Sequence, residues 1–251
     1  MSMNLILEGL DIFDEFEGNE IETKIELYPK KPDLFTCLLK KNIEESKGFL
    51  FKLIPKKEEI LNWTYYFDRY SYKRWSKFVE AYTLIYNPNK EKFWIKIKEL
   101  PENIKSKNEI LIRKENLVRI ERKMTKMDSD LILQRKIKEL GKEIFFLGTI
   151  KRYKVYLLLQ NHKSGRYYSV SADRCQYKKF TLSQIEIEYK GITKIRKIKL
   201  ETAELKKIVT QEIFILSKFL MKKMGNQFKL KKTKQTKFEW LCSCLDQEKS
   251  R

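Results

Sequence analysis

The sequence predicts a mainly β protein of the α+β class, a closed antiparallel β-barrel or tunnel with a charged lumen and flanking helices. Two segments near opposite ends of the chain carry alternating glutamates, Glu20-Ile21-Glu22 and Glu186-Ile187-Glu188. Side chains alternate between the two faces of a strand, so the glutamates of each segment share one face and the apolar residues share the other. Carboxylates that line an interior, with apolar side chains packed outward, indicate a barrel with a charged lumen.

Further segments of the chain have the composition of strands and are joined mostly by short polar links. Closing such a sheet into a barrel removes its exposed edges. The predicted strands lie near 18–28, 48–55, 63–70, 81–87, 91–99, 109–123, 143–160, 165–174 and 181–192.

Helices are predicted where apolar residues recur at helical spacing. Residues 32–45 form a short helix outside the tunnel, and residues 125–140 form a second one that Gly141 would end. Residues 205–225 form an amphipathic helix that we expect to pack on the barrel exterior.

The character of the chain changes near Lys199, which predicts two parts: a tunnel domain at 1–195, and a C-terminal amphipathic helix with a basic tail at 196–251. The segment 222–237 is densely basic. After it, Phe238, Trp240 and Leu241 form a small apolar cluster. We expect this cluster to dock back on the barrel, and the alternative is that it binds a partner.

The length of 251 residues is enough for one sizeable domain with an appendage. A formal net charge of +20 favours an anionic partner such as a nucleotide, polyphosphate, RNA or an acidic surface. An AT-rich coding bias would also raise the lysine content, so the sign of the charge is more informative than its size.

Cysteine spacing and the absence of targeting signals indicate an intracellular chain. Cys37, Cys175, Cys242 and Cys244 match no zinc-site spacing, and the one histidine, His162, cannot complete such a site. The N-terminus has no basic segment followed by an apolar stretch, and no apolar run reaches the roughly 18 residues that span a membrane. We therefore expect a cytoplasmic protein with reduced thiols and no membrane partner.

The early glutamate segment carries a family resemblance. Glu20-x-Glu22-x-Lys24 resembles the ExExK signature of the triphosphate tunnel metalloenzymes, the superfamily that includes CYTH domains, and the strand at 182–191 is similar to its late acidic strand. The resemblance covers about residues 18–192. It implies a closed antiparallel tunnel and metal-dependent action on inorganic triphosphate, thiamine triphosphate, nucleotides or RNA 5′ ends.

Clustered carboxylates repel one another unless a cation lies among them, and hard Mg²⁺ or Mn²⁺ suits oxygen ligands. The resemblance implies that Asp173 is a metal ligand together with four glutamates that also serve catalysis: Glu20, Glu22, Glu186 and Glu188. It further implies that Glu121, which follows Arg119 on a predicted strand, assists the metal or a water molecule.

Basic side chains on inward faces would clamp the phosphate oxygens. At 149–156 the register leaves two faces open, and we favour Arg152 with Lys154 inward because Tyr153, on the other face, suits an outer packed surface. The family usually carries two arginines on the strand near 81–87, and this chain has none there. The predicted substrate-binding residues are Lys24, Lys96, Lys98, Arg119, Arg152 and Lys154.

These residues predict a metal-dependent phosphohydrolase in which water attacks the terminal phosphorus of a triphosphate in line. The substrate would be inorganic triphosphate, a nucleoside triphosphate or an RNA 5′-triphosphate, and the basic tail would add RNA contacts. One alternative is a nucleotidyl cyclase, in which a ribose hydroxyl replaces water. The other is a non-catalytic tunnel that binds triphosphate or RNA.

Overall fold

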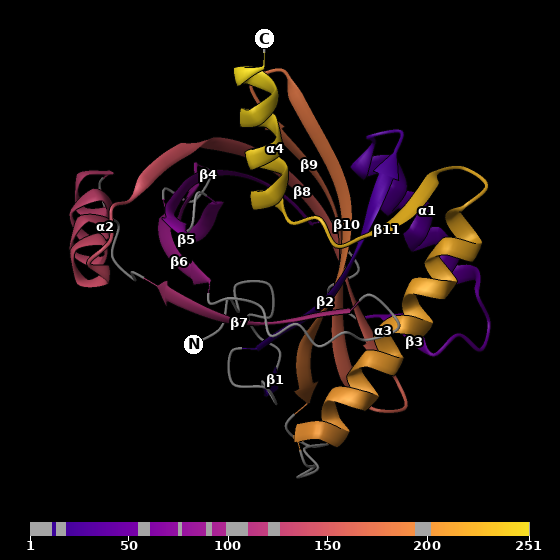
Figure 1. The fold of residues 1–251 in the computed structure, drawn as a ribbon. Helices are drawn as coiled ribbons and strands as arrows, with labels where there is room; N and C mark the ends of the chain where they lie inside the picture. The colour runs from indigo at the N-terminus through magenta and orange to yellow at the C-terminus, as the bar shows by residue number, and fades with distance from the viewer. Residues whose placement is uncertain are drawn as a thin grey trace.

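The strands of the computed structural model pair in one antiparallel sheet that curves round into a ring (Figure 1). The structure describes residues 12–13, 19–54, 61–74, 77–88, 92–98, 110–119, 126–193 and 202–250. Its strands are β1 (Ile12–Phe13), β2 (Asn19–Tyr28), β3 (Phe51–Leu53), β4 (Leu61–Arg74), β5 (Lys77–Asn87), β6 (Lys92–Lys98), β7 (Ile110–Arg119), β8 (Phe145–Asn161), β9 (Arg166–Tyr177), β10 (Phe180–Thr193) and β11 (Lys229–Thr233).

The pairing of β2 with two sets of neighbours makes the ring. The sheet order runs β10-β9-β8-β4-β5-β6-β7-β2, and β2 pairs with β10 as well. Along its other edge, β2 pairs first with β7 and then with β11. The predicted antiparallel tunnel is therefore confirmed, and each predicted strand is present.

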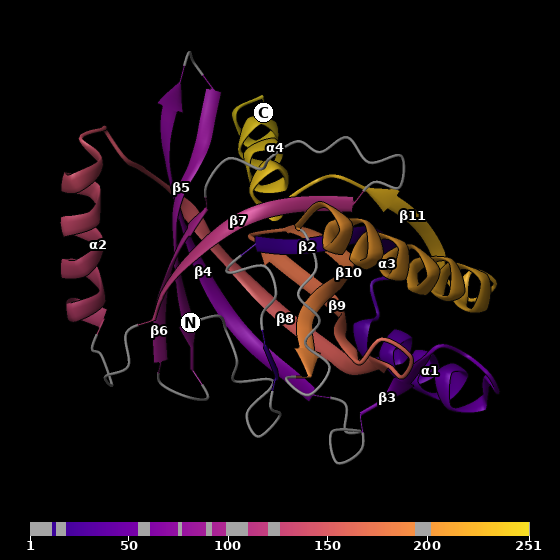
Figure 2. The same cartoon turned by 90° about the horizontal axis from the view of Figure 1, so that it is seen from below.

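Helices flank the ring on different sides (Figures 1 and 2). They are α1 (Pro32–Glu45), α2 (Lys126–Leu140), α3 (Thr202–Met224) and α4 (Lys237–Lys249). α1 and α3 lie together on one outer side and α2 lies on the opposite side. The predicted helices at 32–45, 125–140 and 205–225 are confirmed within a few residues.

The largest hydrophobic core lies between the outer face of the sheet and the helices α1 and α3. The outward residues of β2 and β10, such as Ile21 and Ile187, are fully buried there. Val209, Ile213 and Leu216 of α3 pack in the same core and are also fully buried. The alternation read from the sequence therefore places the apolar face of these strands outward, and the glutamates fall on the inner face.

The C-terminal segment contains a strand and a helix that were not predicted from the sequence. Part of it is β11, which extends the sheet beside β2, and the rest is α4. The short strand has a single apolar residue, Leu230, so its sequence gives no strand pattern, and pairing with β2 decides its conformation. The predicted division between residues 195 and 196 falls outside the described residues.

α4 docks on the ring, as expected from its apolar cluster. Phe238, Trp240 and Leu241 pack with Ile150 and Cys175. Cys175 lies two residues after Asp173 on β9, so α4 covers the face of the sheet that carries the charged residues. Its start has a sequence signature that was not used in the predictions, the capping box formed by Thr236 and Glu239.

Gly148 shows how closely the wall of the ring is packed. Its φ is +142°, and a Cβ atom there would lie 2.6 Å from Cε2 of Tyr177. Gly148→Ala should therefore lower the free energy of unfolding in urea by about 1–3 kcal/mol. Gly48→Ala is the matched control, because Gly48 also has a positive φ, +74°, with nothing within 4 Å of the added atom. Equal losses in the two variants would contradict the steric explanation.

None of the helices in the described part of the chain is both long enough and apolar enough to cross a membrane.

Candidate functional site

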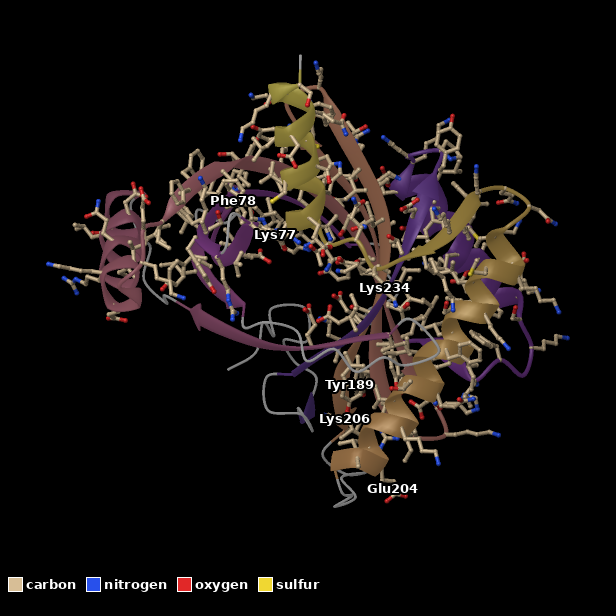
Figure 3. All side chains as sticks on the ribbon, in the orientation of Figure 1. Lys77, Phe78, Tyr189, Glu204, Lys206 and Lys234 are labelled. Atoms are coloured by element: carbon tan, nitrogen blue, oxygen red, sulfur yellow. The ribbon has the colours of Figure 1, made fainter. Side chains whose placement is uncertain are left out.

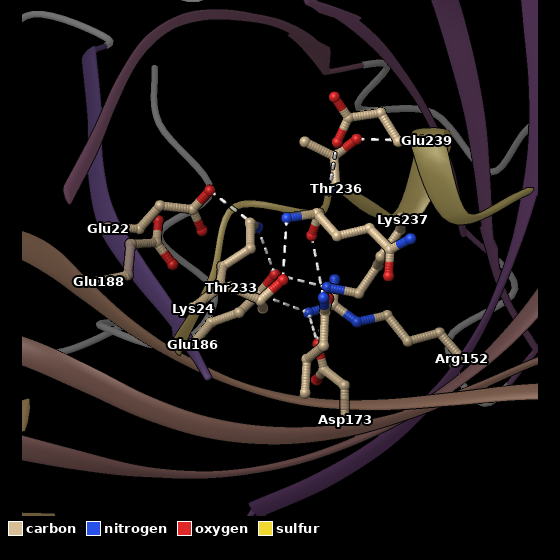
Figure 4. Close-up of polar contacts among 12 residues, drawn as sticks. Glu22, Lys24, Arg152, Asp173, Glu186, Glu188, Thr233, Thr236, Lys237 and Glu239 are labelled. Carbon is tan, nitrogen blue, oxygen red and sulfur yellow. Dashed lines mark hydrogen bonds and ion pairs between the residues drawn. The ribbon is translucent and has the colours of Figure 1, made fainter. Parts of the chain in front are cut away.

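The pairing of β2 with β10 places charged side chains opposite one another on the inner face. Glu22 lies directly opposite Glu188, and Lys24 lies opposite Glu186. Opposite residues of an antiparallel pair have Cβ atoms roughly 5 Å apart, where two like charges are destabilising. The two acidic segments that were predicted to meet are therefore neighbours in the ring (Figure 4).

Glu186 is the centre of a buried ionic network (Figure 4). Its carboxylate accepts from Nζ of Lys24 at 2.7 Å and from Nη2 of Arg152 at 2.7 Å, and it also pairs with Lys237. Burial by itself would raise the pKa of Glu186. The charges of Lys237, Lys24, Arg152 and Lys154 outweigh burial and hold the pKa well below its ordinary value.

Asp173 joins this network from β9. It is fully buried, pairs with Arg152, and lies 2.9 Å from Nζ of Lys237. Its second oxygen, Oδ1, is also buried and has no hydrogen-bond partner among the described residues. A buried carboxylate oxygen without a donor is costly, so Asp173 depends on its ion pairs with Arg152 and Lys237.

Lys154 faces the same interior from β8, opposite Asp173 in the register of the two strands. Burial, together with the charge of Arg152, lowers its pKa from 10.5 to about 8. The favoured register, with Arg152 and Lys154 inward, is therefore the one that the structure adopts.

This shifted pKa predicts a pH effect on stability. Between about pH 8 and 10.5 the unfolded chain keeps a proton on Lys154 that the folded chain has lost. In metal-free buffer, the free energy of unfolding of the wild type relative to Lys154→Met should therefore rise across this window, by up to about 3 kcal/mol. Urea denaturation at a series of pH values measures this difference. A flat or falling difference would show that burial does not depress the pKa.

The opposed pair of carboxylates suits a divalent cation better than Glu186 does. Glu22 lies 2.9 Å from Nζ of Lys24, and Glu188 pairs with Lys190, whereas the carboxylate of Glu186 is already held by cations from three elements. In the part of the chain that is described, no three or more His, Cys, Asp or Glu side chains are grouped to hold a metal. Carboxylate oxygens on facing strands are nevertheless the kind of donor that Mg²⁺ or Mn²⁺ prefers.

The predicted basic residues of β6 and β7 are placed by strand register. Lys96 lies opposite Thr83 of β5 on one side and Leu117 of β7 on the other. Lys98 lies opposite Glu115, and Arg119 lies opposite Trp94. Glu121 falls outside the described residues.

Two basic residues near the site were not predicted from the sequence. Lys237 comes from α4 and reaches Asp173 and Glu186, a contact that depends on the docking of a remote helix. Arg69 of β4 donates to Oγ1 of Thr83 at 2.8 Å and pairs with Glu80. Arg69 therefore places a guanidinium beside β5, the strand that lacks the expected arginines. Arg69 lies in the predicted strand at 63–70, on the same face as Phe67, and this position was the signal that the sequence offered.

Comparison with known proteins gives one informative likeness. No family model and no curated protein matches the chain. Among solved structures, HpAC1 from Hippeastrum, a candidate adenylyl cyclase described as having a dominant triphosphatase activity, superposes with a TM-score of 0.52 at 18% identity, over 89% of this chain and 95% of that one. This chain has the same antiparallel tunnel fold as that protein.

Two other solved structures are similar at lower scores. A candidate adenylate cyclase from Bacillus halodurans has a TM-score of 0.38 at 13% identity, over 80% of this chain and 91% of that one. The RNA triphosphatase Pct1 from S. pombe has a TM-score of 0.36 at 10% identity, over 82% of each chain.

Proposed function

We propose that this chain is a metal-dependent phosphohydrolase that acts on a triphosphate inside the tunnel. The observation that carries the proposal is the inner face itself, where carboxylates from β2, β9 and β10 lie among basic residues from β2, β8 and α4. A triphosphate needs both kinds of group, because cations neutralise its oxygens and carboxylates hold its metal. The activity described for HpAC1 agrees with this proposal.

Glu20, Glu22 and Glu188 would hold Mg²⁺ or Mn²⁺, which when bound neutralises phosphate charge and polarises the phosphorus. Lys24, Arg152 and Lys154 would bind phosphate oxygens, with Asp173 and Glu186 orienting Arg152 through their ion pairs. The walls of the tunnel hold these side chains in place, so catalysis would come mainly from positioning and charge neutralisation. Lys96, Lys98 and Arg119 would extend the phosphate-binding surface along β6 and β7.

Phosphate release tests the proposal. Purified protein would be offered tripolyphosphate, ATP, GTP and 5′-triphosphate RNA, each with Mg²⁺, with Mn²⁺ or with a chelator. We expect metal-dependent release that is lost in Glu20→Gln/Glu22→Gln and kept in Glu26→Gln, a matched change on the same strand. Pyrophosphate with a cyclic nucleotide would identify the cyclase instead. Binding of triphosphate without any turnover would identify a non-catalytic tunnel.

A further inference from the structure

Exposed and half-buried lysines gather on α3, β11 and the residue after β11. None of them is buried, and we call this surface the lysine face; its members are Lys206, Lys207, Lys218, Lys222, Lys223, Lys229, Lys231, Lys232 and Lys234. The one acidic residue within 205–236 is Glu212, and it is buried, where it pairs with Arg166 and accepts a hydrogen bond from Tyr168. Glu204 and Glu26, which lies opposite Lys231, are acids at the margin.

A general excess of lysine in the chain does not explain the lysine face. Residues 126–143 around α2 contain five basic and four acidic residues, and residues 30–47 around α1 contain five basic and three acidic residues. On α1 the charges also pair, as Lys40 with Glu44 and Lys41 with Glu45, each at 3.8 Å. A compositional bias would raise lysine everywhere and would not remove exposed acids from one surface alone. The positive charge of the lysine face therefore requires an explanation other than the composition of the chain.

Helix and strand contribute to one continuous surface. Nζ of Lys218 on α3 lies 4.4 Å from the centroid of the Phe214 ring, and Nζ of Lys232 on β11 lies 5.4 Å from it. Phe214 is half-buried, so part of its ring stays accessible between two ammonium groups. An aromatic ring flanked by cations suits an unstacked base joined to a phosphate backbone.

The lysine face also leads to the interior of the tunnel. Lys234 is exposed (Figure 3). Three residues later, Lys237 is buried, and its Nζ lies 2.9 Å from the carboxylate of Asp173. Between them, the carbonyl of Gln235 accepts a hydrogen bond of 2.9 Å from Nε2 of Gln184 on β10. The chain therefore connects the lysine face to the charged network within three residues.

We propose that the lysine face binds the backbone of single-stranded RNA whose 5′ end reaches the tunnel. The hydrolysis of that 5′ end rests on the proposed function. Closely spaced lysines contact phosphates without reading sequence, and a single strand leaves its bases free to stack on Phe214. α3 alone, at 23 residues, is about 35 Å long, which suits a strand of several nucleotides.

Fluorescence anisotropy with a labelled RNA of about 15 nucleotides tests the proposal. Lys218→Gln/Lys222→Gln/Lys232→Gln should weaken binding at least about 10-fold and reduce the slope of log affinity against log salt by about 2, since each lost phosphate contact contributes about 0.7. Lys40→Gln/Lys41→Gln/Lys47→Gln removes the same charge from the α1 region and should leave both quantities nearly unchanged. Equal losses in both triple variants, or tight binding to phosphatidylserine vesicles with none to RNA, would overturn it.

Two substrates separate this inference from the proposed function. Tripolyphosphate hydrolysis should be the same in the lysine-face variant and the wild type, whereas cleavage of 5′-triphosphate RNA at low concentration should fall with RNA affinity. Hydrolysis of tripolyphosphate without RNA binding would overturn the proposal that the lysine face binds RNA and would support the proposed phosphohydrolase. RNA binding that depends on the lysine face, with no phosphate release from any substrate, would support the RNA-binding proposal and overturn the proposed phosphohydrolase activity.

Discussion

Glu22→Gln should lower metal-dependent phosphate release by about 100-fold or more, while the metal-free protein stays as stable as the wild type or becomes more stable. Glu22 and Glu188 oppose each other across β2 and β10, so removing one charge relieves their repulsion when no cation is present. Lys24, which pairs with Glu22, keeps its second partner Glu186 at 2.7 Å. The loss of activity would then come from the metal and not from the fold.

The measurement combines three readouts on one variant. Phosphate release from tripolyphosphate gives the rate, Mn²⁺ binding by isothermal titration gives the metal affinity, and urea denaturation with chelator gives the stability. Glu26→Gln, on the same strand, should behave like the wild type in all three. Normal Mn²⁺ binding by Glu22→Gln would place the metal elsewhere. Unfolding of the metal-free variant would contradict the predicted relief of repulsion.

Arg152→Met should lower the free energy of unfolding by about 3–5 kcal/mol. Arg152 is the shared partner of Asp173 and Glu186, and both carboxylates are buried. Removing it leaves these carboxylates with Lys237 and Lys24 as remaining partners, and an incompletely compensated buried charge is expensive. Methionine keeps most of the side-chain volume, so the change isolates the charge.

Lys151→Met is the matched control, because Lys151 is exposed and precedes Arg152 on the same strand. It should change the free energy of unfolding by less than about 0.5 kcal/mol. The double variant Arg152→Met/Asp173→Asn should recover part of the loss, since it removes a carboxylate along with its partner. A small effect of Arg152→Met, or no recovery in the double variant, would mean that Arg152 does not compensate these buried charges.

The elements of the tunnel could be predicted from the sequence because its strands alternate strictly. Ile21 and Ile25 on one face, with Glu20, Glu22 and Lys24 on the other, specify which side packs outward, and a slip of one residue would reverse every side chain. The same alternation on β8 and β9 brought Arg152 and Asp173 to the interior. Local spacing carries this information, because β-strand geometry has a period of two.

The C-terminal segment shows where local pattern fails. β11 has no alternating apolar face that would predict a strand. Its backbone is held in a strand by pairing with the free edge of β2, which supplies its hydrogen-bond partners. α4 has a capping box at Thr236, yet its position over the inner face depends on apolar contacts with Ile150 and Cys175 from strands far back in the chain.

The sequence by itself determined the strand faces, the outer helices and the residue types of the charged interior, since each depends on the period of a single element. Tertiary structure alone decided which charges meet. Glu22 opposes Glu188 because β2 pairs with β10, and Lys237 reaches Glu186 because a helix 51 residues away along the chain docks on the inner face. Such contacts depend on strand register and helix docking, and no local period encodes either.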